Sequence, residues 1–171
     1  MIDLKGTIRD VPDFPKKGII FKDITTLLNN PDAFKQVIDT FVTRYKDRNI
    51  KIIVAADARG FIFGGVLAYE LGAALVPVRK KGKLPYKTIS ASYELEYGTD
   101  TLYMHEDAIS PGDKVLVLDD LLATGGTAKA ICDLTERLKG DIVEVAFMIE
   151  LSFLNGRDKL KDYKIFSQII Y

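Results

Sequence analysis

Short runs of branched apolar residues alternate along the chain with longer segments in which apolar residues recur at helical spacing. The runs cover Ile50 to Ala56, Ala74 to Val78, Val115 to Leu118 and Ile142 to Ile149. Runs of this kind are typical of parallel strands buried on both faces. The segments Phe61 to Leu71 and Thr127 to Lys139 have helical spacing and lie between two pairs of these runs. This order predicts an α/β fold built on an open, doubly wound, mainly parallel sheet.

Other segments fall outside this alternation. We expect a helix to begin at Pro31, because Asn30 is a capping residue and proline suits the first helical position. Residues 88–103 are predicted to form a β-hairpin, since apolar and acidic residues alternate within them. The segments Gly18 to Ile24 and Lys164 to Tyr171 have strand-like composition, and we expect them to form a small cap beyond the sheet.

Length and charge narrow the class of protein. A chain of 171 residues commonly forms one domain, and a hydrophobic fraction of 47% is sufficient for its core. Its 24 basic residues face 24 acidic ones, so we expect neither nucleic acid nor a membrane as a partner. The first residues lack the apolar stretch of a signal peptide, and we expect a cytoplasmic protein. Cys132, the only cysteine, falls in a helical pattern and is interpreted as a buried apolar residue.

The loop after the apolar run at 115–118 has the composition of a phosphate-binding turn. It begins with the acids Asp119 and Asp120 and continues through Leu121 to a segment that holds two glycines between threonines: Ala123, Thr124, Gly125, Gly126 and Thr127. Ligands of open α/β sheets bind beyond the carboxyl ends of the strands, where the next helix directs free amides and a positive dipole at an anion. An ordinary strand-to-helix turn is the alternative, although two adjacent acids repel each other unless a ligand or cation uses them.

A second loop of similar character, Asp57-Ala58-Arg59-Gly60, follows the run at 50–56 and precedes a helix. Arg59 offers a planar fork of donors for phosphate oxygens. The strongest basic cluster, Arg79 to Lys83, follows the run at 74–78. Two anion-binding turns at one sheet edge indicate a ligand with two separate phosphate groups. A structural ion pair for Arg59 and a solvated charge run for the basic cluster remain the alternatives.

At these positions the sequence resembles the type I phosphoribosyltransferases. Residues 115–127 are similar to the family's 5-phosphoribosyl-1-pyrophosphate (PRPP) signature, and further blocks appear in the family's order over nearly the whole chain. They are Pro12-Asp13-Phe14-Pro15, Gly18-Ile19-Ile20-Phe21-Lys22-Asp23-Ile24-Thr25, Asp57-Ala58-Arg59-Gly60-Phe61, Arg79-Lys80-Lys81-Gly82-Lys83-Leu84-Pro85 and Ser92-Tyr93-Glu94-Leu95-Glu96-Tyr97-Gly98. The blocks around Phe21 and Glu96 select the branch that uses adenine. The resemblance implies transfer of 5-phosphoribosyl from PRPP to adenine, with AMP and pyrophosphate as products.

The resemblance also implies ligand contacts at the matching positions. Residues Ala123 to Thr127 would hold the 5-phosphate, and Asp119 and Asp120 the ribose hydroxyls. The pyrophosphate would be held by three cationic side chains, those of Arg59, Lys80 and Lys83, and Arg59 would also be catalytic. Mg²⁺ is the implied cofactor, held by PRPP and water with Asp119 or Asp120 as optional ligands and no dedicated protein site.

The adenine contacts implied by the resemblance lie in three segments. Phe21 and Leu121 would sandwich the ring, and the backbones of Ile20 and Lys22 would read its amino edge. Glu96, on a mobile hairpin, would contact the attacking purine nitrogen and accept its proton. Lys22 stands where some members of the family carry arginine, which matters little if the backbone does the reading.

Larger features are implied in the same way. The family pattern is a single domain, here residues 1–171, with a hood contributed by about 1–30 and 155–171, and it assembles as a homodimer. The Ala58–Arg59 peptide is expected to be cis. A phosphoribosyltransferase for another purine is the nearest alternative. A purine-sensing regulator would need a nucleic-acid-binding module for which the chain leaves no room, and a phosphate-binding signalling domain would leave the second anion loop unexplained.

Overall fold

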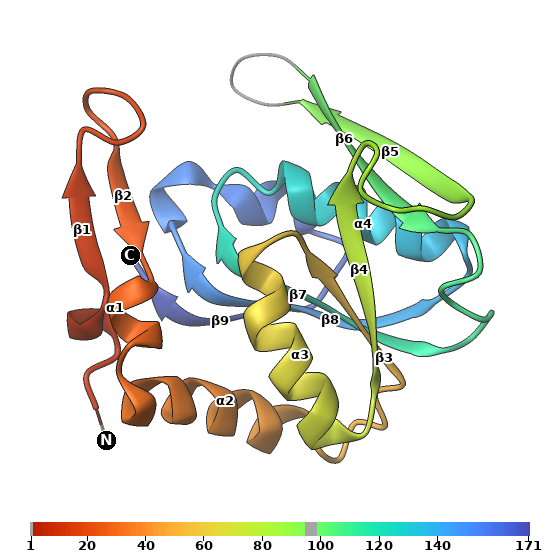
Figure 1. Cartoon of the computed structure of the whole chain (residues 1–171), viewed down its shortest axis with the longest axis horizontal. Coiled ribbons are helices and arrows are strands. Elements are labelled where there is room, and N and C mark those ends of the chain that lie inside the picture. Colours follow the sequence, from red (N-terminus) through yellow and green to blue (C-terminus); the bar gives the residue numbers. More distant parts are fainter. Residues whose placement is uncertain (1, 95–98) are drawn as a thin grey trace. The chain divides into compact units, whose positions relative to one another are not determined.

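The computed structural model describes residues 2–94 and 99–171. The described residues divide into two compact units, one up to Thr43 and the other from Arg44 onward. The first unit contains an antiparallel ribbon in which Val11 lies opposite Phe21. The ribbon consists of β1 (Arg9–Pro12) and β2 (Ile20–Asp23); the turn η1 (Lys5–Thr7) precedes it, and α1 (Thr25–Leu28) and α2 (Pro31–Tyr45) follow it (Figure 1). The last two residues of α2, Arg44 and Tyr45, belong to the second unit. The amide of Ala33 donates a hydrogen bond to the Asn30 side chain at 3.1 Å, and α2 begins at Pro31 as predicted.

The second unit is built on a sheet of seven strands in the order β5-β6-β4-β3-β7-β8-β9. The five strands from β4 to β9 in this order pair in parallel, whereas β6 pairs antiparallel with β4 and β5. The strands are β3 (Ile52–Ala56), β4 (Ala74–Lys80), β5 (Thr88–Glu94), β6 (Thr99–His105), β7 (Lys114–Leu122), β8 (Asp141–Glu150) and β9 (Ile165–Ile170). The predicted α/β class, mainly parallel sheet and hairpin are confirmed.

Two helices, α3 (Arg59–Leu71) and α4 (Gly126–Arg137), cover opposite faces of this sheet. All five residues of β3 are buried, and they alternate between the two faces. Val54 belongs to the apolar cluster on the α4 side. Ala55 and Ile53 face α3, since a Cβ added at Gly64 would lie 3.0 Å from Ala55 Cβ and 3.8 Å from Ile53 Cγ2. The close approach of α3 therefore favours glycine at position 64.

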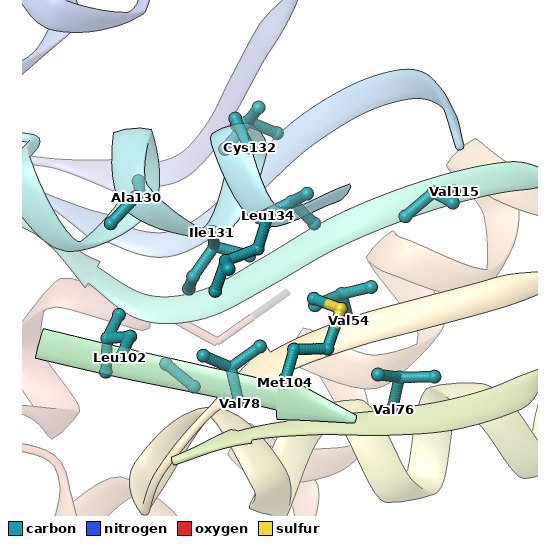
Figure 2. Close-up of a cluster of buried hydrophobic side chains, with 14 of the residues drawn as sticks. Val54, Val76, Val78, Leu102, Met104, Val115, Ala130, Ile131, Cys132 and Leu134 are labelled. Atoms are coloured by element: carbon teal, nitrogen blue, oxygen red, sulfur yellow. The ribbon is translucent and has the colours of Figure 1, made fainter. Parts of the chain in front are cut away.

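The apolar cluster under α4 joins the hairpin to the parallel strands. Figure 2 shows Ile131 and Leu134 of α4 on one side of the cluster and Leu102 and Met104 of β6 on the other. Cys132 is part of the cluster and fully buried, as predicted, and burial raises the pKa of its thiol to about 12. The hairpin is thus anchored by its base to the same core as the central strands.

The C-terminal segment corrects one expectation. Lys164 to Tyr171 was expected in a cap beyond the sheet, but Ile165 to Ile170 form β9, which pairs in parallel with β8 at the edge of the main sheet. Its apolar side chains continue the sheet, and pairing satisfies backbone groups that a separate cap would have to pair elsewhere.

The predicted strand at 18–24 is β2 of the first unit. The hood from about 1–30 and 155–171 and the single-domain organisation stay predictions, except that residues 165–170 of the hood belong to the main sheet. None of the described helices is long and apolar enough to cross a bilayer.

A buried carboxylate on β8 gathers three cationic or phenolic groups. Glu144 is 3% exposed and accepts hydrogen bonds from Arg44 Nε at 2.6 Å and the Tyr45 hydroxyl at 2.7 Å. Arg48 lies 3.5 Å away, and the Arg44 guanidinium also stacks on the Phe166 ring of β9. Burial alone would raise the pKa of Glu144, but the hydrogen bonds from Arg44 and Tyr45 outweigh it and lower that pKa.

We expect Arg44→Met to lower the free energy of unfolding by about 2–3 kcal/mol, because Glu144 then keeps its charge inside the protein with fewer partners. The lowered pKa means that the Glu144 contribution is complete above its unfolded-state pKa and is lost as pH falls through the folded-state value. The deficit of Arg44→Met should therefore shrink in acid. Denaturant unfolding at neutral and acidic pH measures both effects.

Lys35→Met, which removes an exposed ion pair with Asp39 on the same helix, is the matched control and should cost less than about 1 kcal/mol. Equal losses in the two variants would contradict the assignment.

Candidate active site

A cavity of about 260 Å³ opens where the parallel strands β3 and β7 end. Its walls come from the loops after β3 and β7, the start of α4 and the hairpin. Most of the predicted ligand-binding residues meet there, namely Arg59, Lys80, Asp119, Asp120, Leu121, Ala123, Thr124, Gly125, Gly126 and Thr127. Neighbouring parallel strands end at the same edge of a sheet, and this brings together loops that lie some sixty residues apart in the chain.

The turn before α4 has the geometry of an anion site. Gly125 caps the helix with a φ of 79°, in the left-handed region that favours glycine. The first turn of α4 carries no acidic side chain, and the first amides of a helix have no partner within it. These amides and the positive end of the helix dipole favour a bound anion. The residues of this turn, Ala123 to Thr127, line the cavity.

The adjacent acids at the end of β7 lie in different surroundings. The Asp120 amide donates a hydrogen bond to Asp119 Oδ1 at 2.9 Å, and Arg59 Nε lies 2.9 Å from Asp120 Oδ2. Removal from water raises the pKa of Asp119 well above its usual range, and the neighbouring charge of Asp120 raises it further. Burial also raises the pKa of Asp120, against the opposing charge of Arg59. Two crowded carboxyl groups of this kind gain from hydrogen-bond donors or a cation in the cavity.

The cations of the site already have acidic partners. Lys80 Nζ lies 2.8 Å from Asp100 Oδ2 on β6, and this hydrogen bond raises the pKa of Lys80 and lowers that of Asp100. Sequence reasoning missed Asp100, because only the structure shows the hairpin register, in which Asp100 lies opposite Tyr93. Lys83 is exposed in the turn after β4 and does not line the cavity. Its amide donates to the Lys80 carbonyl at 3.2 Å.

The loop after β3 corrects a second expectation. The cis peptide bond there is Asp57–Ala58, one residue before the expected Ala58–Arg59 bond. The pattern of residue types marks the loop but does not distinguish between neighbouring peptide bonds. Asp57 accepts a hydrogen bond from Arg79 Nε at 2.9 Å. Within the basic cluster, Arg79 is therefore a structural ion-pair partner.

The described residues predicted to bind adenine belong to two different units. Leu121 lines the cavity of the second unit. Ile20, Phe21 and Lys22 belong to β2 of the first unit, where the Phe21 ring meets that of Phe14 edge to face at 5.2 Å and Lys22 Nζ pairs with Asp10 at 2.6 Å. Glu96 lies outside the described residues. The roles of these residues stay predictions.

Comparison with known proteins gives the same family from sequence and structure. The family model described as phosphoribosyl transferase domain matches residues 23–170. The adenine phosphoribosyltransferase of Trichlorobacter lovleyi is 58% identical over 167 residues, which cover 98% of each chain. The crystal structure of adenine phosphoribosyltransferase from Thermoanaerobacter pseudethanolicus aligns with a TM-score of 0.96 at 51% identity, covering 99% of this chain and 98% of the other.

A further structural relative was solved with ligands. The adenine phosphoribosyltransferase of Saccharomyces cerevisiae, complexed with adenine and D-2,5-dideoxy-2,5-imino-altritol 1,6-bisphosphate, aligns with a TM-score of 0.92 at 40% identity. The alignment covers 97% of this chain and 96% of the other. The ligand set of that protein combines a purine base with two phosphate groups.

We expect Asp119→Asn to raise the free energy of unfolding near pH 7 by about 0.5–2 kcal/mol, the usual range of one stabilising substitution, while impairing activity. The raised pKa of Asp119 means that its contribution to stability is complete below the unfolded-state pKa and is lost as pH rises through the folded-state value. Asparagine cannot ionise, so the free energy of unfolding of the variant should exceed that of the parent near pH 7 and equal it near about pH 4. Thermal unfolding at both pH values tests this, with the exposed Asp107→Asn as control. A gap that does not depend on pH would argue against crowding of the acid pair.

Proposed function

The chain belongs to the phosphoribosyl transferase family, and we propose that the cavity at the ends of β3 and β7 is where it performs the adenine-specific reaction of that family. The enzyme transfers 5-phosphoribosyl from PRPP to adenine and yields AMP and pyrophosphate. One observation carries the assignment of the site. A single cavity is lined by the glycine turn that opens α4, by the loop with Arg59 that opens α3, and by two crowded acids. A ligand with phosphate groups at both ends of a sugar matches that arrangement.

The 5-phosphate is assigned to the turn Ala123–Thr127. The amides at the start of α4 would donate to its oxygens, and the hydroxyls of Thr124 and Thr127 add further donors. These contacts hold a part of PRPP that does not react. Their binding energy therefore orients the reacting carbon of the sugar.

The ribose hydroxyls are assigned to Asp119 and Asp120. Sugar hydroxyls are neutral donors, so they would hydrogen-bond the two carboxyl groups without adding negative charge. The raised pKa values of both acids support this pairing, because donors from the ligand replace the water that burial removes.

The pyrophosphate is assigned to Arg59 and Lys80, with Lys83 as a further cation from the turn after β4. Arg59 and Lys80 are paired with Asp120 and Asp100 at 2.9 and 2.8 Å. Pyrophosphate would compete for both cations, and their charge would stabilise the negative charge that develops on it as the bond to the sugar breaks.

Mg²⁺ is proposed as the cofactor. Among the residues that the structure describes, no three potential metal ligands lie together. Asp119 and Asp120 offer the oxygen atoms that Mg²⁺ prefers, and PRPP oxygens and water would supply the other ligands. When bound, the ion neutralises charge on the departing pyrophosphate.

The base and its proton are assigned to residues whose roles come from the family resemblance. Phe21 and Leu121 supply apolar surfaces for the adenine ring, and the backbones of Ile20 and Lys22 supply polar groups for its amino edge. Glu96 would accept the proton of the attacking nitrogen. The hairpin that carries Glu96 would also keep water from the positively charged sugar.

A cytoplasmic homodimer is proposed as the working form. Exposed apolar side chains on α3 and at the start of β4 support self-association: Ile62 is 39%, Tyr69 84% and Leu75 39% exposed. PRPP and AMP are charged and cross a bilayer only at high cost, which favours a reaction in the compartment that makes them.

We expect the protein to form AMP from adenine and PRPP with Mg²⁺, and to lose this activity when Mg²⁺ is chelated. Hypoxanthine and guanine should have kcat/KM values lower by at least about 100-fold, because an oxo group leaves buried polar groups that fit an amino group unpaired. Product formation across the three bases at equal enzyme concentration is the measurement. Comparable turnover of hypoxanthine would overturn the choice of base but not the phosphate assignments.

Replacement of Glu96 tests the proposed proton transfer. Glu96→Leu should lower the single-turnover rate of AMP formation by about 10²- to 10⁴-fold, the range of a general base, with little change in PRPP affinity. Glu96→Gln should retain more activity, because it keeps a hydrogen bond. The matched control is Glu94→Gln, an exposed acid on the same hairpin, which should resemble the parent. A Glu96→Leu rate within about threefold of the parent falls below that range and would remove the catalytic role.

A further inference from the structure

The phosphate turn rests directly on the backbone of a distant segment. A Cβ added at Gly125 would collide with the carbonyl oxygen of Gly156 and lie 3.1 Å from its carbonyl carbon. A Cβ added at Gly156 would collide with the carbonyl oxygen of Ala123 and lie 2.9 Å from Leu122 Cδ1. No side chain separates the two backbones. A shift of Gly156 toward the turn therefore has no intervening side chain to absorb it.

A bidentate ion pair holds Gly156 in this place. Gly156 is buried and opens the turn η3 (Gly156–Leu160), after Asn155 in the left-handed region with a φ of 53°. The next residue, Arg157, donates from Nε to Glu150 Oε1 at 2.7 Å and from its terminal nitrogen to Oε2 at 2.6 Å. Glu150 is the last residue of β8, so the pair closes an eight-residue stretch onto the end of a buried strand. Paired planar groups of this kind fix orientation as well as distance.

The surroundings of the pair fit a positioning role. Glu150 is only 5% exposed, and the hydrogen bonds from Arg157 lower its pKa despite that burial. A backbone hydrogen bond also connects the end of β8 to the residue before the turn, since the amide of Leu151 donates to the carbonyl of Leu122 at 2.9 Å. Neither Glu150 nor Arg157 lines the cavity, so any effect on a ligand must act through the turn.

We propose that the Glu150–Arg157 ion pair positions the 5-phosphate turn by pressing the Gly156 backbone against Gly125. Both members of the pair are positioning residues and not catalytic ones. The inference rests on the proposed assignment of the 5-phosphate to Ala123–Thr127. It adds a determinant of PRPP affinity from outside the phosphate signature.

A purely structural ion pair would behave differently. Its loss would lower the melting temperature and leave the folded protein with normal ligand affinity. Loss of a positioning pair lowers the affinity for ligands that carry the 5-phosphate, while the contacts that bind other parts of the ligands are kept. Ribose 5-phosphate reports on the phosphate turn and the ribose contacts, and the KM for adenine reports on the base site.

The experiment compares four variants of the full chain with the parent by titration calorimetry with ribose 5-phosphate and by steady-state kinetics. Arg157→Met breaks the pair, and Arg157→Lys keeps its charge with fewer hydrogen bonds. The double variant Glu150→Gln, Arg157→Met removes both charges and avoids an unpaired buried carboxylate if Arg157→Met alone does not fold. Lys161→Met is the control, because its ion pair with Asp158 at 3.4 Å lies in the same segment and is largely exposed.

Arg157→Met and the double variant should weaken ribose 5-phosphate binding by about 10- to 100-fold, the range of one lost hydrogen bond to a charged group. The KM for PRPP should rise to match, kcat and the KM for adenine should stay within about threefold, and Arg157→Lys should recover part of the loss. Unchanged ribose 5-phosphate affinity in the folded double variant, or an equal loss in Lys161→Met, would overturn the inference. Failure of the parent to bind ribose 5-phosphate would overturn the phosphate assignment itself and the inference with it.

Discussion

Apolar packing on both faces of β3 and β7 is the constraint on which the rest of this structure depends. Because α3 and α4 cover opposite faces, the strands carry apolar side chains until they pass the edge of the helices. Polar side chains can be accommodated only where the strands end. Asp57 directly follows β3, and Asp119 directly follows the apolar run at 115–118. The chemistry is concentrated at one edge because the core excludes it elsewhere.

The cavity holds charges of both signs in close balance. Burial makes the two acids at the end of β7 costly, and Arg59 compensates one of them at 2.9 Å. Lys80 is held by Asp100 in the same manner. A ligand that brings hydroxyl donors to the acids and phosphate oxygens to the cations exchanges one set of partners for another. Binding then costs less than it would in a site of unpaired charges.

Much of this arrangement could be predicted from sequence because it follows from local pattern. The apolar runs located the parallel strands, and the glycine turn at 123–127 located the start of α4 to within one residue. The place of Lys164 to Tyr171 could not be predicted, since a strand-like composition does not name its pairing partner. The same limit applies to Asp100, Gly156 and the Glu150–Arg157 pair, whose roles depend on contacts between distant segments. The position of the cis bond failed for a different reason, because residue types do not specify a single peptide dihedral angle.

The edge position of β9 bears on how the chain is made. β9 follows every other described strand and pairs with β8, so the outer edge of β8 has no partner from this sheet until residues 165–170 have been synthesised. A long buried strand with an open edge is a template for pairing with other chains. A nascent chain that ends before β9 would therefore contain the phosphate turn and both sheet helices, but the outer edge of its strand β8 would be unpaired. Synthesis of β9 closes the edge of β8 that is otherwise open to pairing with other chains.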